Sequence, residues 1–141
     1  MATVYGTNAT IQNASGPPGS FIANGLWGGK VRVMCDVYEA ASIAAATIIA
    51  AAYLPKGAVV LGLSNILTDA LGSSVTISAG ITGTVAKFLA ATACNTAKQR
   101  SFFDVEAGLH YVMTAAGWII LTTAGAAATG TIKTEIYYAV E

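Results

Sequence analysis

From residue 30 onward, apolar and polar residues alternate in short runs. In KVRVMCDVYE (30–39), every second residue is a valine or a cysteine, charged residues and a tyrosine stand between them, and Met34 is the one apolar exception. SSVTISAGI (73–81) and TIKTEIYYAV (131–140) alternate in the same way. Successive side chains of a strand point to opposite faces, so a period of two predicts half-buried strands. In the first of them we expect the apolar face to be the buried one. That face consists of Val31, Val33, Cys35 and Val37.

The next segment, ASIAAATIIAAAYLPKG (41–57), has no charge before Lys56. A membrane-spanning helix needs about 20 apolar residues, and Pro55 ends this run too early. The segment has no basic flank and starts far from the polar first residues, so we do not expect a signal peptide. Its alanines favour a helix, whereas its β-branched and aromatic residues favour a strand. We favour the strand.

The rest of the chain continues in short strand-like runs. AVVLGLSNIL (58–67) predicts a strand, and Ala116-Gly117 predicts a hairpin turn between HYVMT and WIILTT. Residues 86–93 fit a helix or a strand, and we leave both open. About eight short strands with turn signals roughly every 8–12 residues predict an all-β fold, an antiparallel sandwich or barrel.

Residues 1–29 differ from the remainder. They contain SGPPGS and NGLWGG and no charged residue, and proline and glycine favour extended or turn conformations over regular pairing. A disordered tail would lack large apolar residues, so we expect an extended N-terminal arm (1–29) that packs on its own β-sandwich domain (30–141) or on a neighbour. The candidate contact residues are Tyr5, Ile11, Phe21, Ile22, Leu26 and Trp27.

Composition narrows the classes of partner. The 141 residues suit one domain, and only 10% are charged, with seven basic and seven acidic residues. There is no basic field for nucleic acid or anionic lipid, so we expect neither as a partner. A chain that is 55% hydrophobic and nearly uncharged is a candidate for burying much of its surface in an oligomer.

Candidate chemistry is sparse. His110, the single histidine, follows Asp104 and Glu106, but this stretch reads as a loop entering a strand and does not fix a metal geometry. Cys94 with His110 could form a nucleophile and base, yet its apolar neighbours favour a structural thiol, and we expect both cysteines to be free. No phosphate, dinucleotide or hydrolase motif is present. We therefore predict no catalytic, cofactor or metal site, and no enzyme.

Three stretches carry a resemblance. LPKGAVVLGLSNILTDAL, SSVTISAGI and GLHYVMTAAGWIILTTAGAAATGTIKTEIYYAV resemble small tailed-bacteriophage virion proteins, and most of all the capsid decoration, or cement, proteins. The shared features are the LPKGA turn before a strand, a Thr-rich strand ending near a glycine, and a last strand that closes the sandwich. The resemblance covers roughly residues 30–141 and implies a jelly-roll-like β-sandwich.

The resemblance also implies a role. Decoration proteins are commonly homotrimers that bind the major capsid protein lattice from outside and stabilise the shell, so it implies a virion protein at the capsid surface, made in the host cytoplasm. An alternative is a tail or fibre module that binds host glycans, for which Trp27, Tyr137 and Tyr138 are the candidate aromatic residues. A small enzyme or ligand-binding barrel is the third hypothesis.

Overall fold

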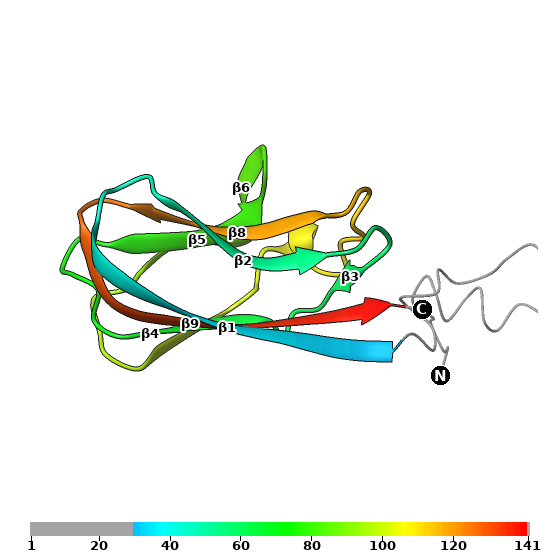
Figure 1. The fold of residues 1–141 in the computed structure, drawn as a ribbon, viewed down its shortest axis with the longest axis horizontal. Coiled ribbons are helices and arrows are strands. Elements are labelled where there is room, and N and C mark those ends of the chain that lie inside the picture. The colour runs from blue at the N-terminus through cyan, green and yellow to red at the C-terminus, as the bar shows by residue number, and fades with distance from the viewer. Residues whose placement is uncertain (1–29, 141) are drawn as a thin grey trace, which may run out of the picture.

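A computed structural model describes residues 30–140, which form two stacked antiparallel sheets (Figure 1). The first sheet has the strand order β1-β9-β4-β7, with β3 also paired to β9, and the second has the order β2-β8-β5-β6. The prediction of an all-β antiparallel sandwich is therefore confirmed. The elements are β1 (Lys30–Ile43), β2 (Ile48–Leu54), β3 (Val59–Val60), β4 (Asn65–Thr68), β5 (Thr76–Ile81), β6 (Thr84–Ala93), β7 (Gln99–Phe102), the 3-10 turn η2 (Glu106–Gly108), β8 (Gly117–Ala124) and β9 (Ala128–Val140).

The connectivity is that of a jelly roll. β1 pairs with β9 along its length, so β3 and β4 share the other edge of β9 and act as one interrupted strand. Counted in this way there are eight strands, and the chain passes between the sheets at every connection except the β5–β6 hairpin. Two four-stranded sheets interleaved in this order are the double Greek key of a jelly roll.

The alanine-rich segment is strand on both sides of a turn. β1 continues to Ile43, the chain turns over residues 44–47, and β2 starts at Ile48. Thr47 Oγ1 donates to the Ala44 carbonyl at 2.7 Å, and the Ala46 amide donates to the Thr123 carbonyl at 2.7 Å. These bonds hold Ala46 at φ 65°, a left-handed conformation that costs an alanine roughly 1–2 kcal/mol. The strand interpretation is confirmed for residues 41–43 and 48–54, and the turn that divides the segment was not predicted.

Two other predicted segments, residues 86–93 and the hairpin at Ala116-Gly117, can be compared with the structure. Residues 84–93 form β6, so the strand alternative holds there, and in Figure 1 the β5–β6 hairpin projects beyond the second sheet. The predicted hairpin around Ala116-Gly117 is wrong. Residues 111 and 113 instead bond across to β3 and its flank, through Val60 N–H to the Tyr111 carbonyl at 3.0 Å and Met113 N–H to the Ala58 carbonyl at 2.8 Å.

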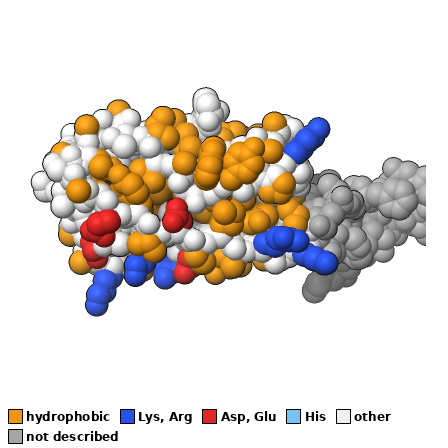
Figure 2. Space-filling view, in the orientation of Figure 1, with side chains coloured by type: hydrophobic (Ala, Val, Ile, Leu, Met, Phe, Trp, Pro, Cys, Tyr) orange, Lys and Arg blue, Asp and Glu red, His pale blue; other side chains and the backbone are white. Residues whose placement is uncertain are grey.

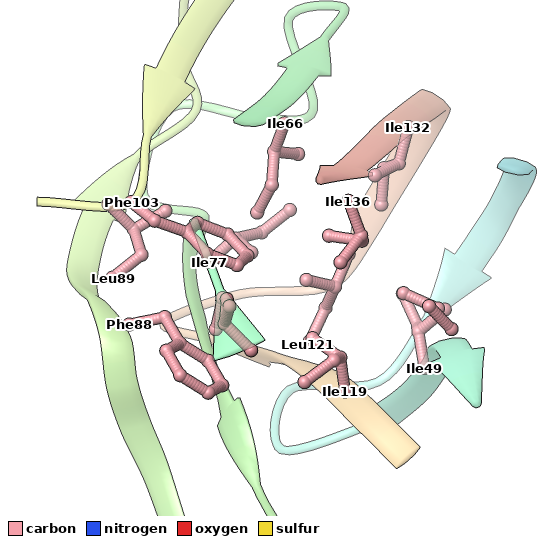
Figure 3. Packing of buried hydrophobic residues seen from close by; sticks show 14 of the residues in the cluster. Ile49, Ile66, Ile77, Phe88, Leu89, Phe103, Ile119, Leu121, Ile132 and Ile136 are labelled. Atoms are coloured by element: carbon pink, nitrogen blue, oxygen red, sulfur yellow. The ribbon is translucent and has the colours of Figure 1, made fainter. Parts of the chain in front are cut away.

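The core lies between the sheets (Figure 3). Ile132 and Ile136 of β9 face Ile119 and Leu121 of β8, and all four are at most 1% exposed. Phe88 of β6 stacks on Phe103 with ring centroids 5.4 Å apart and closes one side of the core. The alternation predicted for residues 73–81 and 131–140 is confirmed, since their expected apolar faces are the buried ones.

β1 faces the opposite way from the prediction. Tyr38 and Met34 pack against the core, whereas Val31, Val33 and Val37 lie on the outer face and are 62%, 48% and 61% exposed. The reason is position. β1 is an edge strand of its sheet, and Arg32 and Asp36 on its inner face are exposed to water.

Candidate interaction surface

The outer face of the first sheet is apolar along its β1 edge. On β9 the outer neighbour of Val31 is Ala139, and that of Val33 is Tyr137. Cys35, which is an exposed free cysteine, lies between Val33 and Val37 on the same face. We call the outer side chains of Val31, Val33, Cys35 and Val37 the valine face. The row itself is uncharged, and on β9 it is flanked by Ala139 and Tyr137 at one end and by Glu135 and Lys133 at the other. Exposed apolar surface of this kind is a candidate interaction site.

The inner face of β1 carries charge. Arg32 pairs across to Tyr138, and Asp36 to Thr134, so both side chains point toward the gap between the sheets. Inward-pointing charges on an edge strand are a known device against edge-to-edge strand pairing, because such pairing would bury them. The edge of β1 is therefore protected, while its outer face is left apolar.

A polar network limits the valine face. Arg100 Nη1 donates to Asn65 Oδ1 at 3.0 Å and to Glu135 Oε2 at 3.3 Å, and Asn65 Nδ2 donates to the same Glu135 oxygen at 3.1 Å. Glu135 is the cross-strand neighbour of Cys35. The Arg100 and Glu135 side chains are 42% and 38% exposed, so solvent screens this ion pair and its contribution to stability is small. It marks where the apolar stripe gives way to polar surface.

The second sheet carries a separate exposed patch. Tyr53 of β2 and Trp118 of β8 are cross-strand neighbours on its outer face, 50% and 47% exposed, with ring centroids 5.2 Å apart in an edge-to-face arrangement. Ile48 of β2 adds a 60% exposed side chain. Ile48 pairs with Thr122 and lies five residues from Tyr53 along β2, so it is separate from the aromatic pair. Figure 2 shows hydrophobic side chains gathered across the molecule in this view, with the acidic side chains in its lower left part and the Lys and Arg side chains along its lower and right edges.

Comparisons with known proteins show the fold. The sequence matches no protein-family model and no curated protein. The structure is similar to a chain of the cyanophage Pam1 capsid asymmetric unit, with a TM-score of 0.67 and 22% identity over 92% of this chain and 95% of that one.

Two further phage capsids contain similar chains. For the capsid of Ralstonia phage GP4 the TM-score is 0.61 with 21% identity, over 80% of this chain and 86% of that one. For the acidic stable capsid of Helicobacter pylori bacteriophage KHP30 it is 0.57 with 13% identity, over 78% and 87%. At such identities the likeness concerns the fold.

The site residues predicted in the arm fall outside the part of the chain that the structure describes. Tyr5, Ile11, Phe21, Ile22, Leu26 and Trp27 all precede residue 30. Of the other aromatic candidates, Tyr138 is 8% exposed and belongs to the core cluster, and Tyr137 is half-buried beside Val33. The exposed aromatic pair is instead Tyr53 and Trp118.

The candidate chemistry is dispersed. His110 sits exposed in a turn at φ 58°, and Asp104 and Glu106 are exposed nearby. Cys94 is 3% exposed and donates to the Thr92 carbonyl at 3.4 Å, and burial raises the pKa of its thiol above the ordinary value. A buried, protonated thiol is a poor nucleophile.

Among residues 30–140 there is no group of three or more His, Cys, Asp and Glu side chains arranged to hold a metal. Within the same range, no helix has the length and apolarity to span a membrane.

Sequence reasoning missed the valine face because alternation shows which residues share a face, not which face is inside. The available signal was on the other face. Met34, Tyr38 and Ala40 follow the same period of two as Arg32 and Asp36. Met34 and Tyr38 are partly buried, and Ala40 is 1% exposed.

Proposed function

We propose that this chain is a structural protein of a bacteriophage virion that decorates and stabilises the outside of the capsid. The observation that carries the proposal is a jelly roll that leaves an uncharged apolar stripe exposed, on a protein with little charge elsewhere. A surface of that kind suits permanent association with other subunits. The similarity of the fold to chains in three phage capsid structures supports the same role.

The proposed partners are the major capsid protein lattice and further copies of this chain, as a homotrimer, at the capsid surface. Residues 1–29 would contact the shell through their uncharged, aromatic-containing sequence, and the sandwich would provide the rigid body. Stabilisation follows from mass action, since a protein that binds only the assembled shell shifts the equilibrium toward it. The role requires area and shape rather than catalysis, nucleic-acid binding or membrane contact.

A glycan-binding module of a tail or fibre is the second candidate. The exposed Tyr53–Trp118 pair favours it, because exposed aromatic rings can stack on sugar faces. A glycan array separates the two roles. Specific glycan binding that Trp118→Ala abolishes would favour the module, whereas a blank array leaves decoration as the better account.

Capsid binding tests the main proposal directly. Capsids of the phage that encodes this chain would be produced without it and mixed with the purified protein, and bound protein would be measured by co-sedimentation. We expect saturable binding with a fixed number of copies per capsid, together with greater resistance of the shell to heat. Absence of binding to intact capsids would refute the proposal.

A further inference from the structure

In an isolated protomer, the apolar valine face of β1 is exposed to solvent, which is not what is expected for a strand that packs on a core. A strand with one buried face normally turns its apolar residues inward, yet β1 places Arg32 and Asp36 inward and three valines outward. The strand pairs with β9 over nearly all of its 14 residues, so its orientation is firmly set. Such local disagreement between pattern and fold is expected at functional sites.

The same strand shows how a partner would approach. The inward charges Arg32 and Asp36 oppose strand addition at the edge, and the bulge between Ala40 and Ile43 interrupts the ladder at its far end. On the outer face, β1 carries no charge from Val31 to Val37, and the charged neighbours Glu135 and Lys133 lie beside it on β9. A partner would therefore pack on the face of the sheet and not extend it.

The outer face of the first sheet sets the largest area that an interface around the valine face could use. β1 has 14 residues and is thus about 46 Å long at roughly 3.3 Å per residue. The sheet is at most four strands wide, which is about 19 Å at a spacing of roughly 4.8 Å. The whole outer face therefore measures about 900 Å², and a standard interface buries about 800 Å² on each partner. The valine face would form the apolar centre of such an interface, and Glu135 and Lys133 beside it on β9 would belong to the polar rim.

We propose that the valine face binds a second copy of this chain. Interfaces between copies of one protein are more apolar than those between different proteins, and the stripe from Val31 to Val37 carries no charge on its outer side. The formal net charge of the chain is zero, so copies do not repel one another at long range. This deepens the proposed function and rests on it only for the expectation of an oligomer.

Cys35 provides a built-in reporter of this interface. It lies inside the valine face and is exposed in the protomer, whereas Cys94 is buried in the core. Binding of a second copy would cover Cys35 and slow its reaction with a charged thiol reagent. Cys94 should react only on unfolding, in every assembly state, and serves as the internal control.

The test combines mass and thiol reactivity on the full chain. Light scattering over a range of concentrations should give a multiple of 14.3 kDa that dissociates on dilution, and Cys35 should become reactive as it does so. The double variant Val33→Lys/Val37→Lys should weaken self-association at least about a hundredfold, because the interface would bury unpaired charge. Ile48→Lys is the matched control, a β-branched residue at 60% exposure on the edge strand of the other sheet, and should leave assembly unchanged. Circular dichroism would establish that all variants fold.

Several results would overturn the inference. These are a wild-type chain that stays monomeric at every concentration, a double variant that assembles like the wild type, or Cys35 protection that persists in the diluted monomer and so comes from the chain itself. The capsid experiment fails independently. If the wild type assembles, the double variant does not, and neither binds capsids, the proposed function is refuted and the interface is supported. If the wild type is a monomer that binds capsids, the interface is refuted and the proposed function is supported.

Discussion

Two glycines with almost the same backbone conformation should respond very differently to alanine. Gly57 has φ 85° and Gly125 has φ 88°, so both are left-handed. A Cβ built at Gly57 meets nothing within 4 Å, whereas one at Gly125 would overlap the backbone carbonyl oxygen of Ser74. The pair therefore separates the conformational cost of a left-handed alanine from the cost of a steric clash.

The magnitudes follow from these two terms. A left-handed alanine costs roughly 1–2 kcal/mol, and the reduced freedom of the unfolded chain returns about 0.4–1 kcal/mol. Gly57→Ala should thus lower the free energy of unfolding by about 1 kcal/mol. Gly125→Ala adds the displacement of packed backbone, about 1–3 kcal/mol for overpacking. At about 4 °C per kcal/mol for a chain of this size, the two melting temperatures should differ by roughly 4–12 °C.

The assay is urea and thermal unfolding followed by circular dichroism. All proteins must be compared at one concentration, since oligomer formation shifts apparent stability. Equal destabilisation by Gly57→Ala and Gly125→Ala would refute the reasoning, because it would mean that the turn between β8 and β9 does not pack on Ser74 as the structure has it.

Three further predictions concern the arm, the buried thiol and the surface ion pair. Deletion of residues 1–29 should abolish capsid co-sedimentation and leave the β-sheet circular dichroism signal intact; retained binding would count against the arm as the shell contact. Burial raises the pKa of Cys94, so its contribution to stability is complete below the ordinary thiol pKa of about 8.5 and is lost as pH rises through the folded value. As pH rises from neutral to alkaline, the unfolding free energy of the wild type should therefore fall more steeply than that of Cys94→Ala. The same fall in both proteins would contradict this. Arg100→Ala should change the unfolding free energy by about 1 kcal/mol or less, as expected for an exposed ion pair, and a larger loss in urea titrations would show that its bond to Asn65 matters more than the geometry indicates.

Much of the fold could be predicted because local pattern and tertiary position agree. In residues 131–140, Ile132 and Ile136 share the core face as the alternation requires, because β9 is a central strand with both neighbours in place. The turn over residues 44–47 could not be located from sequence. It contains no glycine or proline, and tertiary bonds to β8 hold Ala46 in its left-handed conformation.

The candidate surface was harder to predict than the fold. The inward face of an edge strand is partly wet, so burial does not select apolar residues there as strictly as it does in a central strand. The exposed aromatic pair could not be predicted, because Trp118 is the cross-strand neighbour of Tyr53, a contact between residues 65 positions apart. Likewise, Val112 pairs with Val59 and not with β8. The Ala116-Gly117 turn signal is local and carries no information about this tertiary pairing.

The pairing of β1 with β9 has a mechanical consequence. Lys30 pairs with Val140, so the start of β1 and the end of β9 lie at the same end of the sandwich (Figure 1). Tension applied between these two residues would unzip the ladder one pair at a time. Tension applied between Lys30 and Ala128, which lie on different strands at opposite ends of the ladder, would load the pairs together in shear. A subunit held to an expanding shell through the segment before Lys30 would resist a pull directed along β1 far better than one that separates it from β9.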